Sequence, residues 1–196
     1  MLTIVAAVSA PPIWSKDLCS YQNTNQLVWD SQFQKALKDY FGELRDEHFS
    51  AGELVSSQAL DRLGGPPDQL KKIQGGLALA TACMAHSCPE HGAVVLRCPA
   101  EIVAVAIVRY YQQCVPKPPV DLCELLPTVS MYFKNGTTVM TGREAIEGWI
   151  SMLHINWGEN PAPPVVLEYR LPDGKRIRPP YVIAGRVLLD SEPNKK

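Results

Sequence analysis

Apolar residues between Leu27 and Leu44 recur every three or four positions, the spacing that places side chains on one face of an α-helix. Asp30 stands where an N-cap residue is expected, and Gly42 lies near the end of the run. The pattern therefore predicts one amphipathic helix whose buried stripe consists of Phe33, Ala36, Leu37, Tyr40, Phe41 and Leu44.

A second, shorter helix is expected over Glu53–Leu63, since the glycine and proline pairs in Gly64–Pro67 end it and cannot continue it. Beyond this point the periodicity changes from that of helices to that of strands. Short apolar runs at Leu77–Ala82 and Gly92–Leu96 precede a longer one, rich in Val and Ile, at Ile102–Tyr111. Because the three runs are sequential, we expect them to form neighbouring antiparallel strands.

In the C-terminal part, Asn135-Gly136 separates the apolar runs Val129–Phe133 and Thr137–Met140, a pattern typical of a β-hairpin. Thr141–Glu144 has the form of a capping box and opens an amphipathic helical run.

A further hairpin-like turn is expected at Pro172–Gly174, between Val165–Leu171 and a long second arm at Tyr181–Leu189. These elements predict an α+β fold: an antiparallel β-sheet flanked by helices, with a cysteine-closed loop between two strands.

The proline-rich segment Val115–Pro119 predicts a stiff connector, and we expect the domain boundary there. Residues 11–115 would form one α+β domain, and residues 116–196 a connector followed by a hairpin and helix extension of unassigned role. Residues 1–10 read as the remnant of a signal peptide, because an apolar run ends in the small-residue pattern Val8-Ser9-Ala10. Export to the periplasm or secretion is therefore expected.

Composition narrows the class of protein. The chain has 196 residues, of which 46% are hydrophobic and 20% charged, enough apolar surface for a packed core. Its net charge of −1, with no basic stripe, argues against nucleic-acid binding. No run approaches the roughly 20 apolar residues that a membrane-spanning helix needs. Six cysteines, an even number, agree with a disulfide framework in an oxidising compartment.

The segment from Cys83 to Cys88 carries the most informative chemistry. A disulfide between these two cysteines would close a small ring at a strand-to-strand connection, and it would restrict the residues inside before any partner arrives. His86, near the apex, would then be presented to a partner and could donate hydrogen bonds to carboxylates. The residues enclosed by the ring are Met84, Ala85, His86 and Ser87.

Two other chemistries use the same residues. Cys83, His86, Cys88 and His91 could hold a tetrahedral zinc ion in a structural module. A cysteine–histidine nucleophile pair is disfavoured, because a disulfide-bonded cysteine cannot attack a substrate. We therefore expect a non-enzymatic protein without cofactor or resident metal. Pairing of Cys19, Cys98, Cys114 and Cys123 is left open, because three arrangements remain once Cys83 and Cys88 are joined.

The Cys-x-x-His-x-Cys pattern of residues 83–88 resembles the protruding loop of the Ivy-type inhibitors of vertebrate (c-type) lysozyme. The resemblance extends over Phe33–Tyr111, with a helix upstream and strands entering and leaving the loop. It implies an inhibitor whose His86 contacts the two catalytic carboxylates of a lysozyme-like muramidase, with Met84, Ala85 and Ser87 lining the cleft. An envelope immunity protein against another peptidoglycan hydrolase is the alternative that uses the same loop, and a homodimer is left open.

Overall fold

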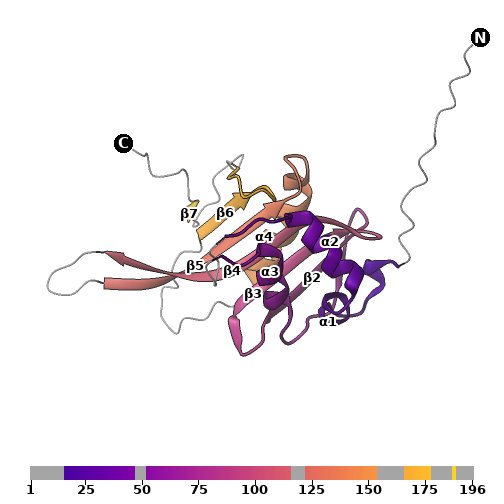
Figure 1. Ribbon diagram of the computed structural model, residues 1–196, viewed down its shortest axis with the longest axis horizontal. Coiled ribbons are helices and arrows are strands. Elements are labelled where there is room, and N and C mark those ends of the chain that lie inside the picture. The colour runs from indigo at the N-terminus through magenta and orange to yellow at the C-terminus, as the bar shows by residue number, and fades with distance from the viewer. Residues whose placement is uncertain (1–15, 47–51, 116–121, 154–165, 178–186, 189–196) are drawn as a thin grey trace, which may run out of the picture.

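The computed structural model of the chain describes residues 16–46, 52–115, 122–153, 166–177 and 187–188 (Figure 1). Helices pack on both faces of one sheet, which confirms the predicted α+β class. The helices are η1 (Leu18–Ser20, a 3₁₀ turn), α1 (Thr24–Val28), α2 (Ser31–Phe41), α3 (Val55–Leu63) and α4 (Thr138–Met152). The strands are β1 (Lys71–Ile73), β2 (Leu77–Met84), β3 (Ser87–Arg97), β4 (Glu101–Val115), β5 (Leu122–Phe133), β6 (Val166–Arg170) and β7 (Val187–Leu188).

The two predicted N-terminal helices are confirmed as α2 and α3. The Asp30 carboxylate caps α2 by accepting hydrogen bonds from the backbone N–H groups of Gln32 (2.7 Å) and Phe33 (3.3 Å). Gly42 follows the last turn with φ 57°, a conformation that glycine adopts without a steric penalty. Helix α3 ends where expected, at Leu63, and Gly64 is its C-cap residue.

The sheet has the strand order β1-β2-β3-β4-β5-β6-β7, so every strand lies beside its neighbour in sequence. The three predicted strands correspond to β2, β3 and β4, and they pair antiparallel as expected. β1 and β5 extend the antiparallel part at its two sides. β6 and β7, however, pair parallel to their neighbours, so the complete sheet is mixed.

Two apolar cores lie on opposite faces of the sheet, because successive side chains of a strand point to opposite sides. In β3, Val94 and Leu96 pack under α1–α3, whereas Ala93 and Val95 belong to the core beneath α4. All four of these side chains are completely buried. A strand covered on both faces needs an unbroken apolar run, and the buried part of β3, Gly92–Leu96, has one.

The hairpin expected at Asn135-Gly136 is wrong, since the residues after it form α4 rather than a returning strand. The Asn135 side-chain oxygen accepts hydrogen bonds from the backbone N–H groups of Thr137 (3.1 Å) and Thr138 (3.0 Å), and so begins the helix. α4 then buries Ile146 and Trp149 against the sheet. As a long crossover it also permits β6 to lie parallel to β5.

The turn expected at Pro172–Gly174 is present. The Leu171 N–H donates to the Lys175 carbonyl (2.8 Å), and the Ile177 N–H donates to the Tyr169 carbonyl (2.7 Å). The expected long antiparallel arm at Tyr181–Leu189 is wrong in its described part, because Val187–Leu188 pairs parallel to β6.

Several sequence expectations fall on parts of the chain outside the described residues. These include the signal-peptide remnant at 1–10 and the proline-rich segment 116–119. On either side of that segment, β4 and β5 pair antiparallel as far as Val115↔Leu122, so one sheet continues across it. No helix in the described part of the chain is long and apolar enough to cross a membrane.

Candidate functional site

The turn between β2 and β3 is the candidate site, because it presents the predicted loop at one end of the sheet. The two strands pair regularly as far as Cys83↔His91, and the next pair is Met84↔Ser87. This register shift places additional β3 residues beside the turn and brings Cys83 and Cys88 together. Their disulfide joins Cα atoms 4.7 Å apart, which confirms the cysteine-closed loop between two strands.

His86 stands at the apex of this turn and is exposed to solvent. Its φ of 63° is the only positive value at a non-glycine residue among those the structure describes. The left-handed region is costly for most side chains, although histidine enters it more readily than most. Ala85 is also exposed, whereas Met84 and Ser87 are half-buried. Histidine is thus the most prominent polar group at the tip.

Gly65, in the segment that follows α3, packs against the backbone of the loop. Its N–H donates to the carbonyl oxygen of Cys83 (3.0 Å), which links the segment after α3 to the end of β2. A β-carbon at this position would overlap the Cys83 carbonyl oxygen and approach the backbone nitrogen of Ala85 to 2.7 Å. Only glycine allows the two backbones to come this close, so the position of the loop depends on Gly65.

An ion pair lies next to the loop, between Arg62 of α3 and Glu90 of β3, with 3.2 Å between Nη2 and Oε2. The Arg62 side chain is only 3% exposed, against 20% for Glu90. Burial lowers the pKa of Arg62, although the neighbouring Glu90 charge opposes the effect. For Glu90, burial raises the pKa more than the Arg62 charge lowers it. The pair joins the base of the hairpin to α3.

The four residues of the zinc alternative are not arranged as a ligand set. Cys83 and Cys88 are joined in the disulfide, and a disulfide offers no thiolate to a metal. His91 belongs to β3, where it is the cross-strand partner of Cys83, and its ring lies 6.2 Å from that of Trp149 in an edge-to-face arrangement. Burial lowers the pKa of His91. His86 is exposed at the apex of the turn.

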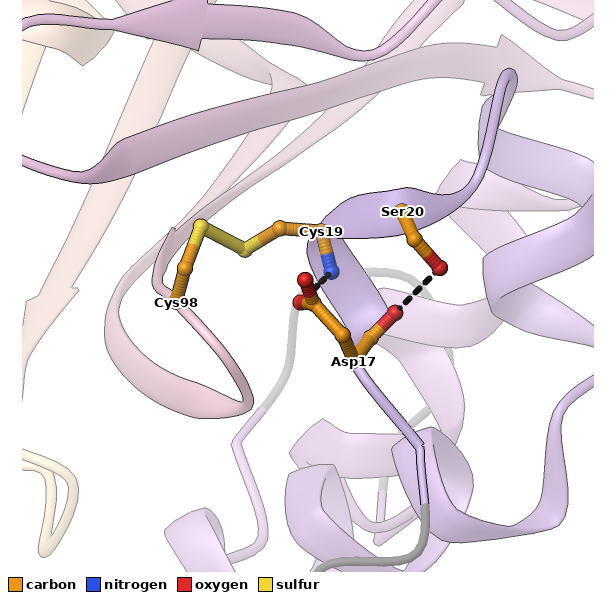
Figure 2. Close-up of a disulfide and its surroundings, with 4 residues drawn as sticks. All are labelled: Asp17, Cys19, Ser20 and Cys98. Atoms are coloured by element: carbon orange, nitrogen blue, oxygen red, sulfur yellow. Dashed lines mark hydrogen bonds between the residues drawn. A yellow bond between two sulfur atoms is a disulfide. The ribbon is translucent and has the colours of Figure 1, made fainter.

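The second disulfide, Cys19–Cys98, ties η1 to the turn between β3 and β4, at the opposite end of the sheet (Figure 2). The sequence left the partner of Cys19 open, and the structure shows that this partner is Cys98. The Asp17 carboxylate accepts a hydrogen bond from the Cys19 N–H (2.9 Å), and the Asp17 carbonyl accepts one from the Ser20 hydroxyl (2.7 Å). Asp17, Cys19 and Cys98 lie close together, but both sulfurs are already bonded to each other.

A buried ionic cluster that the sequence did not reveal joins β4, β5 and β6. Glu168 accepts from the Arg109 guanidinium (3.1 Å), the Arg170 guanidinium (2.9 Å) and the Ser130 hydroxyl (2.6 Å). Arg170 also donates to the carboxylate of Asp46. The sequence indicates this cluster only through charged residues in apolar segments: Arg170 stands at the end of β6, and Arg109 stands inside β4.

The protonation of this cluster follows from its surroundings. Burial by itself raises the pKa of Glu168, but the Ser130 hydrogen bond and the charges of Arg170 and Arg109 outweigh burial and hold that pKa below its ordinary value. Burial lowers the pKa of Arg109 to about 10, so the guanidinium is still charged at neutral pH. The acceptors of Glu168 are engaged by protein donors, as in a structural ion cluster.

A surface pocket of about 370 Å³ lies between α2 and the β3–β4 turn, at the end of the sheet away from His86. Its rim charges neutralise one another, because Glu101 accepts from both Arg97 (2.9 Å) and Lys134 (2.7 Å). The lining residues come from distant parts of the chain and share no sequence signal: Ala36, Asp39, Tyr40, Arg97, Cys98, Pro99, Ala100, Glu101, Ile102 and Lys134.

No protein-family model matches this chain, and no curated protein or solved structure matches it either. The resemblance to lysozyme inhibitors therefore rests on residues 83–88 and on the elements around them.

Proposed function

We propose that this protein is a periplasmic or secreted inhibitor of a lysozyme-like muramidase, and that the 83–88 loop enters the active-site cleft of its target. The observation that carries the proposal is the exposed imidazole of His86 at the apex of a disulfide-closed turn. His86 contacts the catalytic carboxylates, and Ala85 lies beside it at the tip. Met84 and Ser87, being half-buried, line the flanks of the contact.

Preorganisation supports this role. Binding costs conformational entropy for each group that becomes ordered, and a loop that is already closed has less to lose. The Cys83–Cys88 disulfide restricts the backbone within the loop. The hydrogen bond from the Gly65 N–H to the Cys83 carbonyl fixes the loop to the segment after α3. His86 is thus held in a conformation that an open chain would seldom adopt.

The chemistry of the target fits a histidine. Retaining glycosidases hold two carboxyl groups about 5–5.5 Å apart, one acting as general acid and the other as nucleophile or stabiliser. Lysozyme is the type case of this arrangement. A charged imidazole has two N–H donors, so it can bond to both groups, and charge-assisted hydrogen bonds are the stronger kind. Such a contact blocks the substrate and removes the acid from its reaction.

The two disulfides support the proposed periplasmic or extracellular location of the protein. Cys19–Cys98 and Cys83–Cys88 both join pairs in which one residue is exposed, and bonds of this kind persist in oxidising surroundings. Periplasm or extracellular space is where a muramidase and its inhibitor would meet.

The test is inhibition of a c-type lysozyme acting on peptidoglycan by the wild-type protein, His86→Ala and His86→Asn. Asparagine also tolerates positive φ, so His86→Asn keeps the backbone of the turn while removing the imidazole. Loss of one charge-assisted hydrogen bond, worth roughly 1.5–3 kcal/mol, predicts about 10- to 160-fold weaker inhibition by both variants. Circular dichroism melts control for folding.

Inhibition by His86→Ala equal to that of the wild type would exclude the histidine mechanism. If the wild type inhibits no c-type lysozyme but inhibits another peptidoglycan hydrolase in the same panel, the protein is an immunity protein of the alternative kind. Stoichiometric zinc together with free thiols in the purified protein would favour the zinc module instead.

A further inference from the structure

The β4–β5 hairpin extends beyond the rest of the sheet. β3 pairs with β4 only as far as Gly92↔Ile107, and β6 begins to pair with β5 only at Thr128. β4 and β5 nevertheless continue to pair with each other as far as Val115↔Leu122. Figure 1 shows these two strands running out together past the other strands. We call the part formed by residues 110–115 and 122–127 the ribbon.

The ribbon and the His86 loop leave the sheet at the same end. β3 starts at the turn that presents His86 and runs antiparallel to β4, so the far end of β4 lies on the side where β3 begins. Cys19–Cys98 lies at the opposite end, after β3 has finished. The end of the sheet used by the proposed site thus carries two hairpins.

A ribbon of two strands has little stability of its own in water, and in the part of the chain that the structure describes no third strand pairs with this one. Something must hold the far rungs together. The register supplies a candidate, since the Cα atoms of Cys114 and Cys123 are direct cross-strand partners. Opposed residues of an antiparallel pair have Cα atoms about 4.5 or 5.5 Å apart, and disulfides usually span 4.4–6.8 Å.

Cys114 and Cys123 are the two cysteines that the other disulfides do not use. The chain has six cysteines, and four of them form Cys19–Cys98 and Cys83–Cys88. The segment that separates Cys114 from Cys123 contains Pro116, Pro118 and Pro119, which reduce the freedom that ring closure removes.

We propose that Cys114 and Cys123 form a third disulfide, which closes the ribbon as Cys83–Cys88 closes the neighbouring loop. The oxidant is a disulfide donor, either a thiol–disulfide oxidoreductase or oxidised glutathione. The Cys114 thiolate attacks the donor disulfide and forms a mixed disulfide, and the Cys123 thiolate then displaces the donor sulfur. Two electrons and the two protons that the cysteines lost pass to the donor, which is released reduced, as the dithiol of an oxidoreductase or as two molecules of glutathione. This bond does not depend on the proposed inhibitory function.

The experiment is disulfide mapping of the full-length protein purified without reductant. The protein is denatured, its free thiols are alkylated, and non-reduced peptides are analysed by mass spectrometry. We expect no alkylation and one linked peptide pair containing Cys114 and Cys123, lighter by the mass of two hydrogens than the separate thiol peptides. The single variant Cys114→Ser should expose one alkylatable thiol, on Cys123.

Hydrogen exchange measures the consequence of the bond. In Cys114→Ser/Cys123→Ser, the ribbon amides should exchange about tenfold faster or more, because opening of the far rungs is no longer restrained. The β2–β3 amides should keep their wild-type rates, and Cys83→Ser/Cys88→Ser should show the converse pattern. Alkylation of both Cys114 and Cys123 in the wild type, linkage of either to another cysteine, or linkage between two copies of the chain would overturn the proposal. Since the mapping uses wild-type protein, poor folding of a variant does not affect its outcome.

Discussion

Removing the Cys19–Cys98 disulfide should destabilise the protein much more than removing Cys83–Cys88. The first bond joins residues 79 positions apart, and the second joins residues 5 positions apart. In the chain-entropy model a disulfide stabilises by restricting the unfolded chain, and the effect grows with the logarithm of the loop length. This gives about 4.5 kcal/mol for the long loop and about 2 kcal/mol for the short one.

The two bonds form a matched pair for this comparison. Each contains one buried cysteine, Cys19 at 4% and Cys83 at 7% exposure, and one exposed cysteine. Replacing both members of either bond with alanine therefore removes a similar amount of buried sulfur surface. The difference between the two double variants, about 2.5 kcal/mol, isolates the contribution of loop length.

The assay is urea unfolding at 25 °C, followed by tryptophan fluorescence and by far-UV circular dichroism. Coincident transitions from the two probes would justify a two-state analysis of the free energy of unfolding. Cys19→Ala/Cys98→Ala should also show a steeper dependence on urea, because its unfolded chain exposes more surface. Equal losses for the two double variants, or a larger loss for Cys83→Ala/Cys88→Ala, would refute the entropic reasoning.

Three further predictions concern packing and pH. Gly148→Ala in α4 should stabilise the protein by up to about 1 kcal/mol, because nothing lies within 4 Å of the added carbon, whereas Gly142→Ala in the same helix should destabilise it, because that carbon would lie 2.7 Å from a side chain of β4. Gly65→Ala should cost about 1–3 kcal/mol in urea unfolding and shift the amide resonances of the His86 turn; unchanged resonances would argue against support of the loop by Gly65. The lowered pKa of Glu168 means that its contribution to the free energy of unfolding is present above its ordinary value of 4.5 and is lost as the pH falls through the lower folded-state pKa. Glu168→Gln should therefore lose about 3–5 kcal/mol at pH 7 and show a flatter decline in acid, and identical acid profiles for the two proteins would contradict the assignment.

Local patterns explain the parts of the fold that could be predicted. The Asp30 cap and the apolar stripe of α2 lie within a few residues of each other, so the helix follows from neighbouring positions alone. The same holds for β2, β3 and β4, whose apolar runs are separated by short connections. The Cys83–Cys88 ring is local as well, and its two cysteines and the histidine between them are visible in six consecutive letters.

Asn135-Gly136 shows where local patterns stop being decisive. The dipeptide favours a hairpin turn, but the Asn135 side chain serves equally well to begin a helix. The residues after Asn135-Gly136 form α4 and not a strand because the helix buries Ile146 and Trp149 against the sheet, and because Gly142 lets the helix come close to the sheet. Burial against a distant surface outweighs the local turn preference.

Neighbouring residues alone therefore specify the local elements: the first helices, the central strands and the closed loop with His86 at its tip. The contacts between distant residues depend instead on how the whole chain folds. Folding pairs Cys19 with Cys98 and brings Gly65 against the backbone of Cys83, contacts that no spacing rule anticipates. It also buries Arg109 beside Glu168, 59 positions further along the chain. The physical reason is that such contacts gain their energy from burial and charge pairing once the sheet has formed, whereas helix caps and turns gain theirs from adjacent residues.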